Sequence, residues 1–160
     1  MAATPTPYEQ TSVSVARSQE QISKLLRAFG CSGVQFDQDF ETGQCILRFG
    51  IRKEQQLQVV RLEVQPLPPV KLLRGKGWRV SAEQRERQVW RGLHHYLEGN
   101  LKAAEFGLVR FEDIFLAHFE LDPGNGDNRT LSQALRPALE AGIPLIDAIS
   151  RKQLPAGPTS

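Results

Sequence analysis

The chain has 160 residues, of which 40% are hydrophobic and 24% are charged, values typical of one globular domain that buries a core. Its 20 basic and 18 acidic residues leave a formal net charge of +2. The overall charge therefore does not predict a polyanionic partner, and any such partner must be recognised through local clusters of charge.

Two cysteines, Cys31 and Cys45, are fewer than a secreted, disulfide-stabilised protein of this size usually carries. We therefore predict two free thiols in a reducing compartment. The N-terminus lacks the pattern of a signal peptide, and no apolar run approaches the roughly 18 residues of a membrane span. These features predict a cytoplasmic protein with no membrane partner, located in the host cytoplasm if a phage encodes it.

The N-terminal region is predicted to be a flexible tail followed by a helix. Residues 1–14 are rich in Thr, Pro and Ser, which favours a loose tail. In "SQEQISKLLRAFG", Ser18 and Gln21 have the spacing of a capping box, and Gly30 is a typical helix stop. The apolar residues between them fall on one helical face: Ile22, Leu25, Leu26 and Phe29.

The next segments change to the period of two that is typical of strands. "GVQFDQDF", "CILRFGIR" and "LQVVRLEV" each alternate apolar and polar residues, and "ETGQ" and "KEQQ" separate them as turns. This pattern predicts a three-stranded antiparallel meander. Because so small a sheet does not stand alone, one face is expected to pack on a helix.

Residues 65–80, "QPLPPVKLLRGKGWRV", break the strand pattern with three prolines and two glycines. We predict a long Pro/Gly-rich basic connection there. Connections of this length inside compact domains are usually functional or disordered.

The second half is predicted to be helical. Ser81 and Gln84 open a long helix that Gly107 ends, "RFEDIFLAHF" is typical of a shorter helix, and "DPGNGDN" of a turn. A further capping box begins the helix "LSQALRPALEAG". The resulting expectation is an α+β fold with a single domain over residues 15–152, whose helical C-terminal half packs on the sheet, and a flexible tail over residues 153–160.

The segment "VWRGLHHYLEGNLKAAEFGLVRFEDIFLAHFELDPG", followed by "TLSQAL", resembles the C-terminal half of a family of small uncharacterised proteins of tailed bacteriophages and prophages. The shared positions are Trp90, Leu93, Leu101, Glu105, Gly107, Phe111, Glu112, Phe115, Leu116, Leu121 and Gly124. The chain departs from the family in a longer turn and in Glu98 and Asn100, where family members commonly have lysines. The resemblance implies a phage context and brings no known activity.

A basic segment is the strongest candidate for a binding site. "VKLLRGKGWRV" contains no acidic residue, its glycines let the backbone conform to a ligand, and its tryptophan can stack on an exposed base. The candidate nucleic-acid-binding residues are Lys71, Arg74, Lys76, Trp78 and Arg79. The alternative is a solvated linker whose tryptophan folds back onto the core. The sequence of this segment does not indicate whether the nucleic acid is single-stranded or duplex.

Arg48 and Arg52 are four residues apart on one predicted strand and therefore share a face of the sheet. They are candidates to extend the basic segment into a groove for nucleic acid. The alternative is that both are outward-facing residues that serve solubility.

Two further sets of residues are of the types that bind metal ions. Glu105, Glu112 and Asp113 flank Gly107, where two helices folding back would bring three carboxylates together for Mg²⁺, although acids in a first helical turn also suit the helix dipole. The adjacent histidines of "HH" are predicted to point about 100° apart on a helix and so not toward one ion. We predict no metal and no cofactor.

Three functions remain open from the sequence. The favoured one is a non-enzymatic phage-type accessory protein in DNA metabolism. The second is a protein–protein adaptor, or an inhibitor of a host or phage enzyme. The third is a divalent-metal-dependent nuclease, for which no nucleophile motif, phosphate-binding loop or dinucleotide fingerprint offers support.

Overall fold

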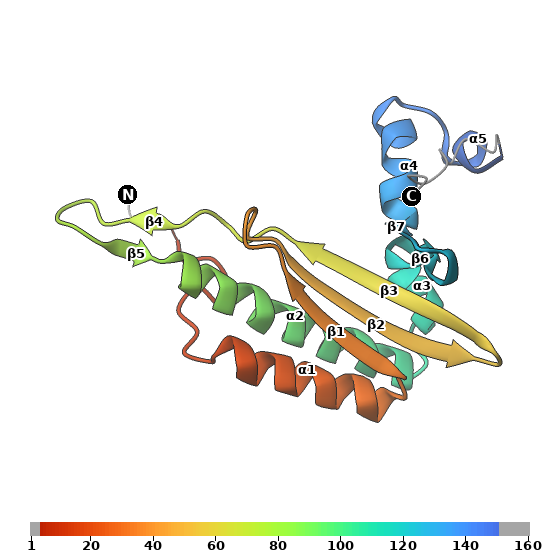
Figure 1. Ribbon diagram of the computed structural model, residues 1–160, viewed down its shortest axis with the longest axis horizontal. Coiled ribbons are helices and arrows are strands. Elements are labelled where there is room, and N and C mark those ends of the chain that lie inside the picture. The colour runs from red at the N-terminus through yellow and green to blue at the C-terminus, as the bar shows by residue number, and fades with distance from the viewer. Residues whose placement is uncertain (1–3, 151–160) are drawn as a thin grey trace.

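The structure, a computed structural model that describes residues 4–150, is a three-stranded sheet with two helices against one face (Figure 1). The predicted α+β class is confirmed. The elements up to the long helix are α1 (Val15–Phe29), β1 (Gly33–Gln38), β2 (Cys45–Lys53), β3 (Gln56–Val64), β4 (Val70–Lys71), β5 (Trp78–Val80) and α2 (Ala82–Glu105). They are followed by α3 (Phe111–Phe115), the 3₁₀ turn η1 (Leu116–His118), β6 (Glu120–Asp122), η2 (Pro123–Asn125), β7 (Asp127–Thr130), α4 (Leu131–Glu140) and α5 (Leu145–Ser150).

The central sheet is the predicted meander, with the antiparallel order β1–β2–β3. Leu47 of β2 lies opposite Phe36 of β1 and Leu62 of β3, so that apolar residues of all three strands share one face. The period of two along each strand explains why this face is apolar. The register places the turn between β2 and β3 at one end of the sheet and the exit from β3 at the other.

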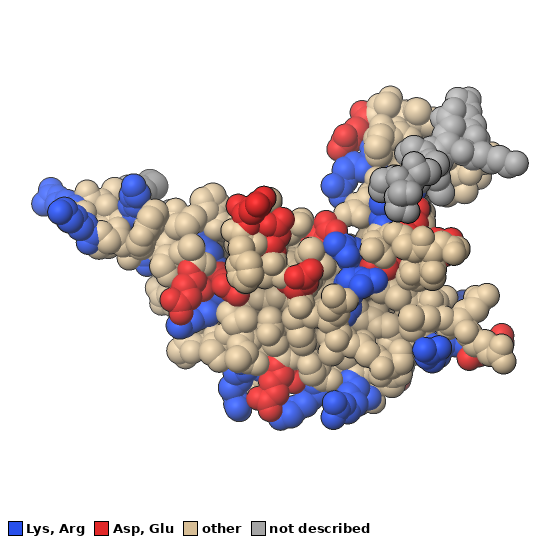
Figure 2. Space-filling model, viewed as in Figure 1, with Lys and Arg blue, Asp and Glu red and all other residues tan. Residues whose placement is uncertain are grey.

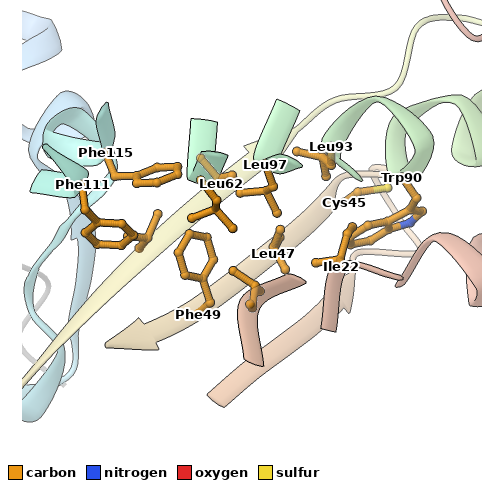
Figure 3. Packing of buried hydrophobic residues seen from close by; sticks show 13 residues of the cluster. Ile22, Cys45, Leu47, Phe49, Leu62, Trp90, Leu93, Leu97, Phe111 and Phe115 are labelled. Atoms are coloured by element: carbon orange, nitrogen blue, oxygen red, sulfur yellow. The ribbon is translucent and has the colours of Figure 1, made fainter. Parts of the chain in front are cut away.

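The core lies between this face and the helices α1, α2 and α3 (Figure 3). Trp90 of α2 is 1% exposed and meets Phe36 edge to face, with 5.5 Å between ring centroids. Phe49 of β2 meets Phe115 of α3 in the same way, also at 5.5 Å. Edge-to-face pairs contribute beyond their buried area, and these two join the sheet to α2 at one place and to α3 at another.

The first helix begins earlier than its capping-box pattern predicts. Ser14 is the N-cap, and its hydroxyl accepts a hydrogen bond from the amide of Arg17 at 3.2 Å. Ser18 is a buried residue inside the helix. The prediction of a start at Ser18 was wrong because Ser14 caps the helix with its hydroxyl alone, without a Glu or Gln three residues later, and "VSVAR" supplies an additional helical turn. The predicted end at Gly30, which has a φ of 104°, is confirmed.

The N-terminal segment differs from the loose tail expected of its composition. Residues 4–14 form no helix or strand, but Glu9 is buried against α2. Its carboxylate accepts hydrogen bonds from the Thr6 hydroxyl (2.9 Å) and from Nη1 of Arg85 (3.2 Å), and the bond from Thr6 holds the pKa of Glu9 below its usual value. Gln84 donates to the carbonyls of residues 9 and 11 instead of reaching back to its own N-cap. Polar contacts therefore fix this segment.

The C-terminal part extends away from the sheet near β3 (Figure 1). The turn predicted in "DPGNGDN" lies inside a β6–β7 hairpin, and the bridge between Val60 and Phe119 connects this region to the edge strand β3. The capping box of Thr130 and Gln133 is confirmed in both directions. The tail predicted over residues 153–160 lies outside the described residues. No helix within residues 4–150 is long and apolar enough to cross a membrane.

Candidate nucleic-acid interface

The basic segment forms a two-stranded hairpin. Residues 70–80, called here the β4–β5 hairpin, pair Val70 with Val80 and Lys71 with Trp78, and the amide of Leu72 donates to the carbonyl of Gly77 at 3.3 Å. The sequence predicts an irregular connection over residues 65–80, whereas the structure contains this short ribbon. Figure 1 shows the hairpin beyond one end of the sheet, on the opposite side of the molecule from α4 and α5.

The turn of the hairpin depends on its glycines. Gly75 has a φ of 89° and Gly77 a φ of 135°, backbone conformations that glycine adopts without steric cost. The two strands are therefore able to reverse within a few residues.

The base of the hairpin is attached to the body of the protein. Val80 is buried, and Nε of Arg85 on α2 donates to the carbonyl of Pro68 at 3.0 Å. Nη1 of Arg79 lies 3.5 Å from a carboxylate oxygen of Glu9. The charge of Arg79 is therefore partly neutralised. Among the five predicted hairpin residues, Arg79 is the one whose charge helps to hold the hairpin against the N-terminal segment.

The outer part of the hairpin carries unneutralised positive charge. Lys71, Arg74 and Lys76 are exposed, and none of them pairs with an acidic residue among residues 4–150. The sequence has no acid between Glu63 and Glu83. Figure 2 shows basic side chains grouped at the far end of the hairpin with no acidic side chain beside them.

Trp78 stands on the hairpin and does not fold back into the core. It is 51% exposed, and Nζ of Lys71 lies 5.4 Å from the centroid of its ring. A cation at that distance is attracted by the ring face, which orients the indole while leaving much of it open. The alternative of a tryptophan folded back onto the core is not what the structure shows.

Two leucines at the tip of the hairpin are exposed and are not among the binding residues predicted from the sequence. Leu72 is 45% exposed and Leu73 is fully exposed. The signal was available, since "KLLRGKG" places an apolar pair beside a glycine-rich reversal with no partner strand to bury it. Proteins that bend duplex DNA insert apolar side chains of this kind between base steps.

Arg48 lies on the open face of the sheet and is fully engaged by other side chains. Its Nε and Nη2 donate to the two carboxylate oxygens of Glu120 at 2.6 and 2.9 Å, and its Nη1 donates to Gln35 at 2.8 Å. The hydrogen bond to Glu120 raises the pKa of the guanidinium. Glu120 is fully buried on β6, so the ion pair connects the sheet to the C-terminal part. The guanidinium of Arg48 is therefore not available to bind nucleic acid, and the prediction that it is a binding residue is not supported.

Arg52 is exposed on the same face but is distant from the hairpin. It pairs with Leu57 beside the β2–β3 turn, seven residues before β3 ends at Val64, a span of about 24 Å along a strand. The hairpin follows the other end of β3. Arg48 and Arg52 therefore do not form one continuous groove with the hairpin, because the meander places them progressively farther from it.

The three carboxylates that folding back of the helices would bring together for Mg²⁺ do not form a cluster. Glu112 forms an ion pair with Lys53 at the end of β2. Within residues 4–150, Glu105, Glu112 and Asp113 do not bring three ligand atoms together. Glu112 and Asp113 lie on the first turn of α3, where acids suit the helix dipole. The thiols of Cys31 and Cys45 are free, as predicted, and burial raises the pKa of each to about 11.

The chain matches no family model, and neither the curated proteins nor the solved structures include a detectable relative. The resemblance to phage proteins therefore stays a prediction, and the function has to be inferred from the hairpin itself.

Proposed function

We propose that this protein is a non-enzymatic, phage-type accessory protein that contacts nucleic acid through the β4–β5 hairpin, in DNA metabolism and in the cytoplasm. The observation that supports the proposal most is the combination, on one anchored ribbon, of a half-exposed tryptophan and three basic side chains that have no acidic partner within residues 4–150. The phage context rests on the sequence resemblance alone.

The dimensions of a two-stranded ribbon suit a nucleic-acid groove. Paired strands lie about 4.8 Å apart, and the major groove of B-DNA, about 12 Å wide, admits such a ribbon. Lys71, Arg74 and Lys76 would meet backbone phosphates and release counterions. Trp78 offers a stacking surface for an unpaired base. If the ribbon instead enters the minor groove, Leu73 offers a wedge between base steps.

Tryptophan fluorescence tests the proposal because the two tryptophans differ in exposure. Trp90 is 1% exposed and Trp78 is 51% exposed, so a soluble quencher such as acrylamide reaches mainly Trp78. Adding an oligonucleotide is expected to change the emission and to protect the accessible tryptophan from quenching. A Trp78→Phe variant should lose that response. Unchanged emission and quenching at micromolar protein with excess DNA or RNA would contradict the proposal.

Replacing Trp78 with alanine is expected to weaken binding to single-stranded DNA by about 1–3 kcal/mol, the usual contribution of one base stacked on an aromatic ring. Titrating the variant against a labelled single strand measures the loss. Phe106→Ala is the matched control, because Phe106 is an exposed aromatic residue at the end of α2, outside the hairpin. An equal loss in both variants would assign the effect to something other than stacking on the hairpin.

A protein partner is the second candidate, and the C-terminal arm of α4 and α5 supports it. The exposed apolar residues there are Leu139, Leu145, Ile146 and Ile149, and grouped exposed apolar side chains often mark protein contacts. As an adaptor or enzyme inhibitor, the protein would retain a stoichiometric partner from a bacterial lysate. Ile146→Asp should abolish that capture, while changes in the hairpin should leave it intact.

A further inference from the structure

One turn of α2 brings three potential metal ligands together. His94 and Glu98 are separated by four residues and His95 and Glu98 by three, so all three project from neighbouring positions on the helix. One ligand atom from each lies within 4.8 Å of the others. The two adjacent histidines, expected to point about 100° apart, instead bring ligand atoms within this distance. Their rings stand edge to face with 5.0 Å between centroids, because rotation about the side-chain bonds offsets the 100° step of the helix.

His94 is the buried member of this cluster. It is 8% exposed, and its Nδ1 is buried with no hydrogen-bond partner among the described residues. A buried polar atom without a partner is costly and uncommon in folded proteins. Burial lowers the pKa of His94 below its ordinary value, and the positive charge of Arg91 adds to this effect. A bound ion would give this buried imidazole a partner that it lacks among the described residues.

The other two members are held by contacts that keep them near His94. The ring of His95 stacks on Tyr8 of the N-terminal segment, with 4.9 Å between centroids and 10° between planes. Its Nδ1 lies 3.7 Å from a carboxylate oxygen of Glu98. The other oxygen of Glu98 accepts a hydrogen bond from Nζ of Lys102 at 3.0 Å, and this bond lowers the pKa of Glu98. The carboxylate of Glu98 therefore lies between His95 and Lys102.

We propose that His94, His95 and Glu98 bind a divalent first-row transition-metal ion of the zinc type. Two imidazoles and one carboxylate form a donor set that suits such ions, whereas Mg²⁺ and Ca²⁺ prefer oxygen ligands throughout. Three protein ligands leave a fourth tetrahedral position for water. The proposal is independent of the nucleic-acid hairpin, since none of the three residues belongs to it.

The geometry requires only a small adjustment of the side chains. Tetrahedral ligands about 2.05 Å from zinc are roughly 3.4 Å apart, so atoms now within 4.8 Å must approach by about 1.4 Å at most. The side chains of His95 and Glu98 are partly exposed, so solvent leaves room for that movement.

Calorimetric titration of the full chain, without a polyhistidine tag, tests the site with Zn²⁺ and with Mg²⁺. We expect one Zn²⁺ per chain and no binding of Mg²⁺. His95→Ala and Glu98→Gln should each weaken Zn²⁺ binding by about tenfold or more, since even the loss of a residue that supports a ligand costs about that much. His94 is left unchanged in these variants because its removal would also disturb the core.

Two control variants keep the test specific. The first control, Glu83→Gln, removes the acidic residue of the ion pair between Glu83 and Arg87 on α2. The second, His118→Ala, removes the histidine that lies outside the cluster. Both should bind Zn²⁺ as the unchanged chain does. The spectrum of the Co²⁺-loaded protein should lack the intense thiolate band, because neither cysteine belongs to the cluster. No Zn²⁺ binding, or binding that His95→Ala and Glu98→Gln leave unaltered, overturns the proposal.

A substitution of Lys102 is expected to strengthen Zn²⁺ binding instead of weakening it. Its ammonium group occupies one oxygen of Glu98 and repels a dication, so Lys102→Met is expected to tighten Zn²⁺ binding several-fold. The same substitution at Lys24, which pairs with Glu20 on α1, should have no effect. Unchanged affinity in Lys102→Met would contradict the assignment of Glu98 as a ligand.

Discussion

Replacing Arg74 and Lys76 with glutamine is expected to weaken binding to duplex DNA by about 60-fold at about 0.1 M salt. For each phosphate contact, log K falls with log salt at a slope of about −0.9. Relative to 1 M salt, each contact therefore strengthens binding roughly eightfold at about 0.1 M salt, and the loss of two contacts multiplies these factors. Both side chains are exposed at the turn of the hairpin and pair with no acid among the described residues, so their loss should not affect folding. Fluorescence anisotropy of a labelled duplex measures the change.

The matched control removes the same charge from a different surface. Lys24→Gln with Arg27→Gln also takes one lysine and one arginine from the chain, on the exposed side of α1. A protein that binds through the hairpin should lose at most a few-fold in that control. If both double variants weaken binding equally, nonspecific attraction to the whole protein, and not the hairpin, is responsible.

Arg48→Met is expected to lower the free energy of unfolding by about 3 kcal/mol, the lower end of the usual cost of breaking a buried ion pair. The variant leaves the carboxylate of Glu120 fully buried, and among the described residues Arg61, 3.9 Å from it, is the remaining basic group that pairs with it. For a chain of this length the melting temperature should fall by roughly 6–12 °C. Chemical denaturation followed by circular dichroism measures the change, and DNA binding of the folded variant should be unaltered.

Two comparisons test the cause of this loss. Arg52→Met, on the same face of β2 but exposed, should change stability by no more than about 0.5 kcal/mol. Adding Glu120→Leu to Arg48→Met should recover most of the loss, because the buried carboxylate that lost its partner is then removed. If Arg48→Met is as stable as the unchanged chain, the two groups do not form the ion pair in solution.

Much of the fold could be predicted from the sequence because its signals are local. The period of two from residue 33 to 64 and the turns "ETGQ" and "KEQQ" specify the meander, and the capping pair Thr130 and Gln133 specifies the start of α4. Each depends on neighbours within a few residues. Where two local signals competed, as with Ser14 and Ser18 at the start of α1, the prediction failed.

The contacts that the sequence did not reveal join residues far apart in the chain. Glu9 is buried by Arg85, and Arg48 is bound by Glu120, at separations of 76 and 72 residues. A Thr- and Pro-rich N-terminus has the composition of a loose tail whether or not a distant arginine binds it. Likewise, the outward position of Arg48 is the same for a free and for a paired side chain.

The candidate site was only partly predictable. The composition of "VKLLRGKGWRV" identified its basic residues and its tryptophan, but not the pairing of Lys71 with Trp78 that forms a ribbon. Strand pairs of two and three residues are too short for an alternation pattern, and they form here because Val80 and the connection to Arg85 anchor the base. The convergence of His94 and His95 depends on side-chain rotation, about which helical spacing gives no information.

The most direct test of a nucleic-acid role is the salt dependence of binding. Anisotropy of labelled single-stranded DNA, duplex DNA and RNA would be measured with the full chain at several salt concentrations. With three basic side chains on the hairpin engaged, log K for duplex DNA should fall with log salt at a slope of about −2.7, and the Arg74→Gln/Lys76→Gln variant should reduce that slope to about −0.9. No binding at low salt up to tens of micromolar protein, or a slope that the variant leaves unchanged, would contradict a hairpin that binds nucleic acid.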